Sequence, residues 1–380
     1  MNLPVYLDYN ATTPVDPAVV EAMLPYLTQH FGNPASSHAY GTAAEAAVAM
    51  ARAQAAALLG CRPEELVFTA CASESSNLAI KGATLAQRAR GRHLITSQVE
   101  HPATQNSCRY LAQEFGCTLT ELPVDGDGRV DPDALRRALR PDTVLITLIA
   151  AQNETGVLQP LAAVGRIARE QGVLFHVDAA QMVGKLPVDV EAIGCDLLSV
   201  AGHKLYAPKG IGALYVRQGV ALHPLLHGAG YEGGRRAGTL NVPYIVALGK
   251  ACALAAAALA TGEAARIRSL RDRLEAALTA AVGARRNGHP SERLPGTLNL
   301  SIPGIVGNDL LAAVPEVAAS TGSACHAGIS RPSEVLLAMG VDPELARGVL
   351  RLSLGRWTTA EEVDFAADRL AAGVRRLRPA

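Results

Sequence analysis

The sequence predicts an open α/β fold with a mainly parallel sheet, followed by a smaller C-terminal domain of α+β type. The central part of the chain alternates short apolar runs with longer amphipathic ones, which is the pattern of βαβ units. The pattern changes after Gly238, where a long stretch rich in Ala, Leu and Arg begins. A chain of 380 residues also exceeds the size at which one hydrophobic core usually stops growing, so we expect two domains.

Six apolar runs are the predicted strands of the sheet. They are ELVFTA (65–70), RHLITSQ (92–98), DTVLITLIA (142–150), GVLFHVD (172–178), CDLLSVA (195–201) and GALYVR (212–217). Helical segments lie between them, among them residues 104–115 and 160–171. Each of these two is followed by a glycine of the kind that ends helices.

The C-terminal part is predicted to begin with one long helix from about Pro243 to Val282. A strand with a proline-glycine turn is predicted in LPGTLNLSIPG (294–304), and the remainder holds further helix and the segment VLRLSLGR (349–356). We predict a large domain over residues 16–260 and a small domain formed by residues 1–15 and 261–380.

The composition excludes several classes of partner. The 35 basic and 35 acidic residues cancel, so the chain lacks the positive charge that a nucleic-acid or anionic-membrane partner requires, and we expect a small-molecule ligand. Seven cysteines without CxxC pairs argue against a disulfide framework and a metal site, and fit a cytoplasmic protein. The N-terminus lacks the pattern of a signal peptide, and no run is expected to have the length needed to span a bilayer. ACALAAAALA (251–260) is too short and too weakly hydrophobic to span, and is predicted to be a helix.

Polar side chains follow five of the predicted strands. Ligands of open parallel sheets bind beyond the carboxyl ends of the strands, so these side chains are candidates for one site. They include Ser73, His101, Asn153, Asp178, Gln181, His203 and Lys204. Each alone has an ordinary explanation, since an Asp at a strand end is commonly a helix cap and a His there is usually structural.

Together these residue types match the needs of pyridoxal 5'-phosphate. Its aldehyde requires a lysine for a Schiff base and its pyridine nitrogen requires a carboxylate, which Lys204 and Asp178 supply. Ser73 and His203 suit its phosphate, His101 suits its ring, and Asn153 or Gln181 suits its 3'-hydroxyl. The alternative for Lys204 is a solvated loop lysine, which the constrained sequence GHKLYAPKG (202–210) disfavours.

Cys325 lies in STGSACHAG (320–328), among small residues. This stretch alone leaves two interpretations open. Free cysteine is often a buried packing residue, whereas a cysteine on a loop of small residues can be presented as a nucleophile.

The chain resembles the cysteine desulfurases of the class V aminotransferase family nearly from end to end. The matching segments are YLDYNATTP, ESSNLAIKG, EHPA, QNETG, HVDAAQ, GHKLYAPKG, GRRAGTLN, STGSAC and RLSLGR. The resemblance implies the pyridoxal-phosphate-dependent transferase fold type I, with a mainly parallel seven-stranded sheet in the large domain and a smaller α+β C-terminal domain.

The resemblance also implies roles for the cofactor-binding residues. Lys204 would be the Schiff-base lysine, Asp178 the pyridinium partner and His101 the ring-stacking acid/base, with Asn153 and Gln181 as further contacts. Ser73, His203 and Thr239 would bind the phosphate, with Thr239 reaching across from the second subunit of a homodimer.

For the substrate, the resemblance implies that Arg351, Asn10 and Asn153 bind the carboxylate of L-cysteine and that Cys325 is the nucleophile. The alternative for Arg351 is a strand-edge arginine paired to an acidic surface side chain. The implied reaction converts L-cysteine to L-alanine and leaves a persulfide on Cys325, which passes to an acceptor protein or thiol such as an iron–sulfur scaffold.

Other activities remain open at this point. The sequence ACH (324–326) also resembles selenocysteine lyases, a plain aminotransferase shares the fold, and a non-catalytic scaffold would keep it to bind sulfur-carrier partners. The chain departs from the family in having Ser73 for a threonine, Ala201 for a serine, and Ala229 and Tyr231 in GAGYEGGRRAGT (228–239). These departures affect the expected cofactor affinity, substrate range or partner.

Overall fold

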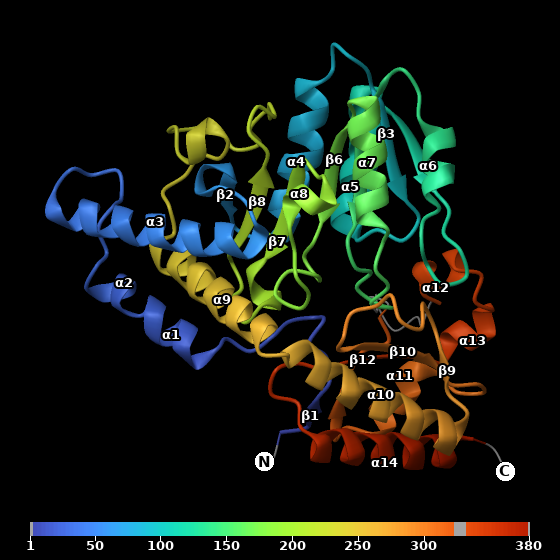
Figure 1. Ribbon diagram of the computed structural model, residues 1–380. Coiled ribbons are helices and arrows are strands. Elements are labelled where there is room, and N and C mark those ends of the chain that lie inside the picture. Colours follow the sequence, from blue (N-terminus) through green and yellow to red (C-terminus); the bar gives the residue numbers. More distant parts are fainter. Residues whose placement is uncertain (1–2, 323–331, 379–380) are drawn as a thin grey trace.

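The computed structural model describes residues 3–322 and 332–378, so Cys325 lies outside the described residues. Figure 1 shows a large sheet flanked by helices and, beneath it, a second group of helices and short strands near both ends of the chain. The candidate site lies in the upper part, at the edge of the sheet that faces this second group.

The large sheet has seven strands in the order β2-β8-β7-β6-β5-β3-β4. They are β2 (Leu66–Thr69), β3 (His93–Ser97), β4 (Thr118–Leu122), β5 (Thr143–Ile149), β6 (Leu174–Asp178), β7 (Leu197–Ala201) and β8 (Gly212–Val216). Strands β7, β6, β5, β3 and β4 pair in parallel, whereas β8 runs antiparallel to both β7 and β2. The predicted mainly parallel sheet is confirmed, and all six predicted strands belong to it.

Strand β4 is the one strand of this sheet that the apolar pattern does not reveal. Its sequence TLTEL is largely polar, and only Leu122 is buried. It lies at the edge of the sheet, where fewer side chains are covered. Central β5, in contrast, is buried at all seven positions and therefore has the continuous apolar sequence typical of parallel strands.

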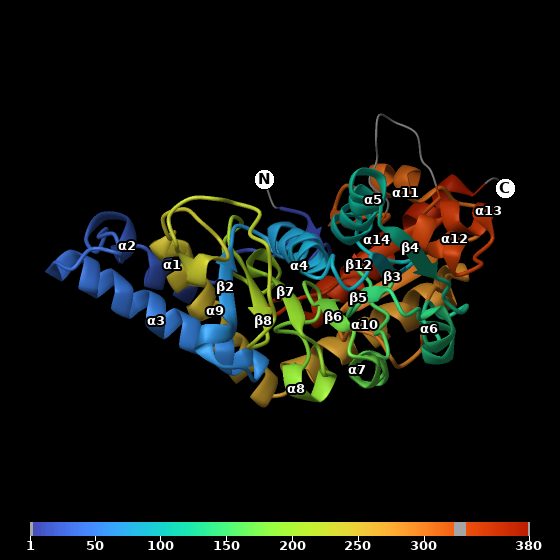
Figure 2. The same cartoon turned by 90° about the horizontal axis from the view of Figure 1, so that it is seen from above.

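Helices cover both faces of the sheet (Figure 2). On one face lie α4 (Ala72–Ala86) and α5 (Pro102–Phe115); on the other lie α6 (Pro132–Ala138), α7 (Leu161–Gln171) and α8 (Val190–Ile193). Neighbouring residues of β5 serve the two faces, since Leu145 packs with α4 and α5 while Ile146 packs in the larger cluster on the opposite face. Gly116 and Gly172 end α5 and α7 in the left-handed conformation, as predicted.

Four further helices pack together at one end of the sheet, on the left of Figure 1. They are α1 (Pro17–Met23), α2 (Pro25–Thr28), α3 (Ala39–Leu59) and α9 (Val242–Ala260). With 19 residues and a mean hydropathy of 1.8, α9 is long and apolar enough to cross a membrane, contrary to the prediction that no run has the required length. It packs against α3 and α1, and its buried residues belong to the main core.

The prediction of one helix from Pro243 to Val282 is wrong. Helix α9 ends at Ala260, and α10 (Glu263–Val282) starts after Gly262, which has a φ of 81°. A left-handed glycine cannot continue a right-handed helix, so the chain turns here and α10 enters the lower part of the molecule.

The lower part contains two small sheets. Strand β10 (Thr297–Ser301) pairs antiparallel with β12 (Val349–Ser353) and β9 (Arg285–Arg286), and β1 (Val5–Tyr6) pairs in parallel with β11 (Val317–Ala318). Helices α10 and α14 (Ala360–Leu377) cover the three-stranded sheet, and α11 (Gly307–Ala313), α12 (Glu334–Ala338) and α13 (Pro343–Arg347) complete this part. The strand predicted in 294–304 is thereby confirmed as β10, and the segment 349–356 contains β12.

A separate hydrophobic cluster lies in this lower part, formed mainly by α10, α14, β10 and β12, and it includes Leu7 from the N-terminal segment. This cluster does not fix where one domain ends and the next begins. The division into residues 16–260 and residues 1–15 with 261–380 stays a prediction.

Candidate active site

Seven of the predicted site residues line one cavity of about 210 Å3 at the carboxyl ends of the parallel strands. They are Ser73, His101, Asn153, Asp178, Gln181, His203 and Lys204. They meet because parallel strands end at the same edge of the sheet, and each of these residues ends a strand or follows one. Cys71 and Ala201 also belong to the walls.

Asp178 is the last residue of β6 and is almost fully buried. One of its oxygens, Oδ1, accepts a hydrogen bond of 3.0 Å from the backbone N–H of Ala180. Two residues earlier on the same strand, His176 lies between Thr147 and Ser199, with ring-to-hydroxyl distances of 2.8 and 2.9 Å. Burial lowers the pKa of His176 to about 4, so a neutral polar group lies beneath the carboxylate.

His101 is the residue that precedes the first turn of α5. Its Nδ1 accepts a hydrogen bond of 3.1 Å from the backbone N–H of Ala103, so the neutral ring carries its proton on Nε2. Burial lowers the pKa of His101; Asp178 opposes this effect and Lys204 adds to it. The imidazole is therefore neutral near pH 7 and has one N–H to offer.

Lys204 ends a single 3-10 turn, η2 (Gly202–Lys204), which follows β7 directly. Burial lowers the pKa of its amine to about 8, with Asp178 raising and Arg351 lowering it. An amine of this pKa has a substantial unprotonated fraction at neutral pH, which is the nucleophilic form. Lys204 is only partly exposed and lines the cavity, which argues against the alternative of a solvated loop lysine.

The start of α4 forms another wall of the cavity, with Cys71, Ala72 and Ser73. The Sγ of Cys71 accepts a hydrogen bond of 3.4 Å from the backbone N–H of Glu74, and Ser73 is exposed in the first helical turn. Opposite, His203 Nδ1 lies 3.1 Å from Thr12 Oγ1. Burial and nearby lysines lower the pKa of His203 to about 4. Because a helix N-terminus has unpaired N–H groups, this wall suits an anion.

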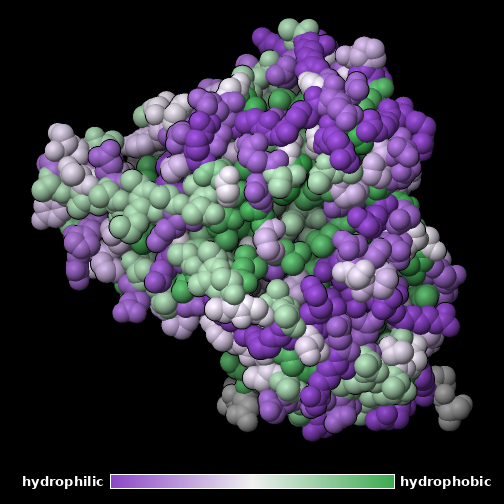
Figure 3. Space-filling view, viewed as in Figure 1, coloured by the Kyte–Doolittle hydropathy of each residue, from purple (hydrophilic) through white to green (hydrophobic). Residues whose placement is uncertain are grey.

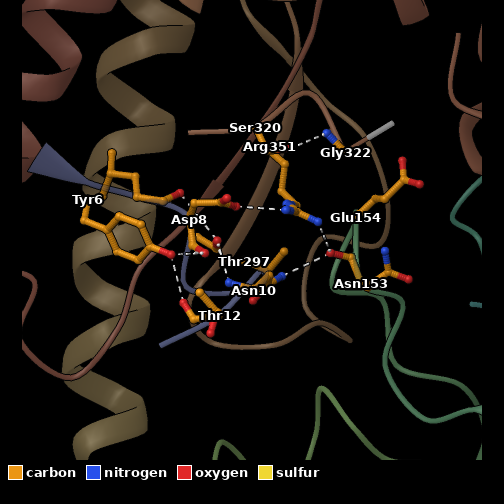
Figure 4. Close-up of polar contacts among 12 residues, drawn as sticks. Tyr6, Asp8, Asn10, Thr12, Asn153, Glu154, Thr297, Ser320, Gly322 and Arg351 are labelled. Atoms are coloured by element: carbon orange, nitrogen blue, oxygen red, sulfur yellow. Dashed lines mark hydrogen bonds and ion pairs between the residues drawn. The ribbon is translucent and has the colours of Figure 1, made fainter. Parts of the chain in front are cut away.

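Arg351 lies on β12 in the lower part of the molecule and contacts Asn153 of the cavity wall, but does not itself line the cavity (Figure 4). Its Nη2 is 2.8 Å from Asp8 Oδ1, and its Nη1 donates to the backbone oxygen of Asn153 at 3.2 Å. Arg351 thus pairs with a carboxylate, but only 7% of it is exposed, so it is not a surface arginine. Its Nε is buried and has no hydrogen-bond partner among the described residues.

Asn10 lies beside Arg351 and is also buried. Its Nδ2 donates to the backbone oxygen of Asn153 at 3.2 Å and to Thr297 Oγ1 at 2.9 Å. Both of its amide N–H groups are therefore used within the protein. A substrate carboxylate would bind Asn10 by replacing one of these acceptors, and the longer bond to Asn153 is the weaker one.

Thr239 does not line the cavity. It is exposed in the segment between η3 (Glu232–Gly234) and α9. Two ion pairs hold this segment to the rest of the upper part: Arg236 lies 3.0 Å from Glu74, and Arg52 lies 2.6 Å from Glu232. An exposed Thr239 near the start of α4 agrees with a role at a second subunit, which stays a prediction.

Cysteines other than Cys325 are mostly packing residues. Cys108, Cys195 and Cys252 are buried, and burial raises the pKa of the Cys252 thiol to about 12. Cys71 alone lines the cavity. Among the residues that the structure describes, no group of three or more His, Cys, Asp and Glu side chains is placed to hold a metal ion.

The segment from residue 5 to residue 365 matches the family model described as Aminotransferase class-V. This chain belongs to the class-V aminotransferase family. The resemblance noted from the sequence motifs is therefore confirmed.

Similar class-V proteins match over almost the whole chain. A protein of Anaeromyxobacter dehalogenans (strain 2CP-C) named Cysteine desulfurase IscS is 49% identical, and the match covers 100% of this chain and 94% of the relative. A solved structure titled "NIFS-LIKE PROTEIN" has a TM-score of 0.91 at 37% identity and covers 97% of this chain and 99% of its own. Another, titled "SspA in complex with cysteine", has a TM-score of 0.81 at 37% identity, with 93% and 99% covered. These similarities confirm the predicted fold class.

The donor set of the cavity fits pyridoxal 5'-phosphate, the cofactor of the class-V family. Asp178 supplies a buried carboxylate for a protonated pyridine nitrogen, and Lys204 supplies an amine for an aldehyde. The N-terminus of α4 supplies N–H groups for a phosphate. Ala201 is buried in the wall and contributes no hydroxyl, so one phosphate donor expected from the family is missing.

Sequence reasoning assigned no role to three charged residues around this class-V site: Asp8, Glu100 and Lys185. Asp8 pairs with Arg351, and Glu100 is buried just before His101. Lys185 contacts both Gln181 and Asn10. The available signals were weak: Lys185 follows Gln181 by four residues and Glu100 follows a strand, but neither pattern identifies a partner that is distant in the sequence.

Proposed function

We propose that this chain is a pyridoxal 5'-phosphate-dependent cysteine desulfurase, which converts L-cysteine to L-alanine and carries the sulfur as a persulfide on Cys325. The observation on which the proposal rests is the cavity where the amine of Lys204, the carboxylate of Asp178 and the imidazole of His101 meet. The names of similar proteins support the same reaction, since one relative is named a cysteine desulfurase and SspA was solved with cysteine.

In this proposal, pyridoxal phosphate supplies an electron sink that stabilises negative charge on the substrate carbon. Asp178 would keep the pyridine nitrogen protonated, and Lys204 would bind the aldehyde carbon. His101, Asn153 and Gln181 would hold the ring and its hydroxyl. Ser73, His203 and the first N–H groups of α4 would bind the phosphate, together with Thr239 of a second subunit.

Lys204 and His101 move the protons of the reaction. When it is not bound to the cofactor, the Lys204 amine has a pKa of about 8 and would take up a proton from the substrate carbon at near-neutral pH. His101 has its exchangeable proton on Nε2, because Nδ1 is occupied by the N–H of Ala103. The two groups therefore divide the roles of base and acid.

Arg351 binds the substrate carboxylate, assisted by Asn10 and Asn153. The support for this assignment is the buried Nε of Arg351, which has no partner among the described residues. An unpaired buried donor is costly, and a bound carboxylate would remove that cost.

Cys325 accepts the sulfur. Its thiolate attacks the substrate sulfur, so that a sulfur–sulfur bond forms as the bond between that sulfur and the substrate β-carbon breaks. The electron pair of the broken bond goes to the carbon, which takes up a proton and becomes the methyl group of alanine. Cys325 is oxidised to the persulfide while the carbon is reduced, so no further oxidant is needed.

A homodimer is part of the proposal because Thr239 is exposed and does not line its own cavity. Apolar side chains are exposed on α2, on α3 and on the residues that flank α2: Leu24, Leu27, Phe31, Tyr40 and Met50. Figure 3 shows a band of hydrophobic surface along α3 and α9 in the same region. A second copy of the chain would cover this surface.

The persulfide sulfur then passes to an acceptor protein or thiol in the cytoplasm, with iron–sulfur cluster biogenesis as the proposed destination. The support is the name of the A. dehalogenans relative, Cysteine desulfurase IscS.

An absorption spectrum of the purified protein, followed by assays of alanine and sulfide with L-cysteine, tests the proposal. We expect visible absorption and equal amounts of alanine and released or bound sulfur. Lys204→Ala should abolish the absorption, whereas Cys325→Ala should retain it and lose sulfur transfer. Lys81→Met is a matched control, because Lys81 lies over the ring of Tyr110 and does not line the cavity.

Three results would contradict the proposal. A protein that binds no pyridoxal phosphate would lack the proposed cofactor. Release of alanine from L-selenocysteine alone would make the chain a selenocysteine lyase. An unchanged rate of alanine and sulfide formation in Cys325→Ala would exclude Cys325 as the nucleophile.

A further inference from the structure

Lys185 lies behind the wall of the cavity, one turn after Gln181. Its Nζ donates to Gln181 Oε1 at 2.7 Å and to Asn10 Oδ1 at 3.2 Å. It lines a second, smaller cavity together with Lys204 and Tyr206. Within residues 3–322 and 332–378, Lys185 forms no ion pair, so two amide oxygens take the place of a carboxylate partner.

An amine next to an amide determines which way the amide points. Lysine only donates hydrogen bonds in its charged form, so the oxygen of each amide must face it and the NH2 group must face away. The other contacts agree with this orientation: Gln181 Nε2 donates to the backbone oxygen of Asn10 at 2.9 Å, and Asn10 Nδ2 donates to Asn153 and Thr297.

The orientation of Gln181 matters for the cavity that it lines. Its Nε2 has two N–H groups, and one of them has no partner among the described residues. The opposite orientation would bring the amide oxygen to the same place. An amide N–H attracts the 3'-hydroxyl oxygen of a pyridoxal, which is an acceptor when ionised, whereas an amide oxygen repels it.

We propose that Lys185 is a positioning residue that holds the amide of Gln181 with its one unpaired N–H toward the bound cofactor. This inference rests on the proposed function only for the nature of the cofactor. Asn10 is held by the same amine, so Lys185 links the cofactor wall to the residues around Arg351.

The charged form of Lys185 imposes this orientation, and the neutral form is compatible with it although its lone pair is also an acceptor. Burial, with the nearby positive charges of Lys204 and Arg351, lowers the pKa of the Lys185 amine to about 7. The neutral amine still has two N–H groups, which equals the number of amide oxygens that face it.

A double-mutant cycle on cofactor binding tests the proposal. Apoprotein is titrated with pyridoxal 5'-phosphate, and the dissociation constant and the absorption maximum are measured for the parent, Lys185→Met, Gln181→Leu and the double variant. We expect each single variant to bind about tenfold more weakly with a shifted absorption maximum. The double variant should bind no more than about twofold more weakly than Gln181→Leu, because Lys185 acts through Gln181.

Two further measurements separate positioning from a general structural effect. Lys185→Gln keeps two N–H groups and should recover most of the affinity, and thermal melting of each apoprotein reports whether it is folded. If Lys185→Met binds with the parent's affinity and spectrum, or if the two losses multiply to about a hundredfold in the double variant, the proposal is wrong.

The titration uses no cysteine, so it distinguishes the two proposals. A parent protein that binds the cofactor but forms no alanine from cysteine contradicts the proposed reaction. The double-mutant cycle on cofactor binding can still be measured in that case. A parent protein that binds no cofactor overturns both.

Discussion

The Nη2 atom of Arg351 lies 2.8 Å from the Oδ1 atom of Asp8, a residue 343 positions earlier in the chain (Figure 4). This ion pair joins the N-terminal segment to β12 beside the candidate site. The guanidinium therefore has a carboxylate partner before any substrate binds, and its Nε still has no partner among the described residues. A fixed partner orients the guanidinium and leaves a donor for a second carboxylate.

Replacing Arg351 by Gln should raise the KM for L-cysteine by roughly 10- to 150-fold, because a hydrogen bond to a charged group contributes about 1.5–3 kcal/mol. The absorption spectrum of the loaded protein should remain. Steady-state kinetics of alanine formation measures the change. Arg286→Gln is the control, since Arg286 is an exposed arginine paired with Glu275 and should leave KM unchanged. An unaltered KM in Arg351→Gln would remove Arg351 from the substrate site.

The rate at which apoprotein captures pyridoxal phosphate should follow the free amine of Lys204. Burial lowers the pKa of this amine to about 8, so its reactive fraction rises about tenfold from pH 6 to pH 7 and levels off above about pH 8. Stopped-flow absorbance measures this rate. A rate that keeps rising tenfold per unit up to pH 10 would show that Lys204 titrates like an ordinary solvated lysine.

Glu100 should make the apoprotein less stable as the pH rises. Burial, with the charge of Asp178, raises the pKa of this carboxyl to about 8, although the Ser97 hydroxyl bond opposes the shift. The native state holds this proton up to about pH 8, whereas the unfolded chain loses it above about pH 4.5. The stability that Glu100 contributes is therefore fully present below pH 4.5 and lost as the pH rises through 8.

Urea unfolding of Glu100→Gln beside the parent checks this prediction, since glutamine does not titrate. The stability difference between them should change by about 1.4 kcal/mol per pH unit between pH 5 and pH 7, in favour of the variant at higher pH. A difference that stays constant over this range would mean that Glu100 titrates normally.

Glu232→Gln should destabilise the protein through Arg52. The Glu232 carboxylate is buried and accepts bonds from Arg52 and from the backbone N–H of Phe68 at 2.8 Å, which ties the Thr239 segment to β2. Loss of the negative charge leaves the largely buried guanidinium unpaired, at a cost of about 2–4 kcal/mol. Thermal or urea unfolding measures it.

Glu64→Gln is the matched control for Glu232, because the ion pair of Glu64 with Arg62 is exposed and should be worth less than about 1 kcal/mol. Equal effects of the two variants would contradict the structural role assigned to Glu232.

Local pattern was sufficient for most of the sheet. The strands from β2 to β8 other than β4 were predicted because buried parallel strands need apolar residues on both faces. The local sequence pattern did not predict the edge strand β4. It also did not predict the break between α9 and α10, where Gly262 ends an otherwise continuous helical pattern. A single glycine is compatible with a helix, so only the observed φ of 81° decides that the chain turns there.

The sequence by itself determined the class of the site, because one sheet edge collects whatever follows its parallel strands, and Asp178, Lys204 and His101 all follow strands. Tertiary structure alone decided which side chains contact one another across long separations. The pairing of Asp8 with Arg351 and the contact of Lys185 with Asn10 depend on how the N-terminal segment packs between the two parts. Burial then set the pKa values of Lys204, Lys185 and Glu100, since removal from water penalises the charged form of each group.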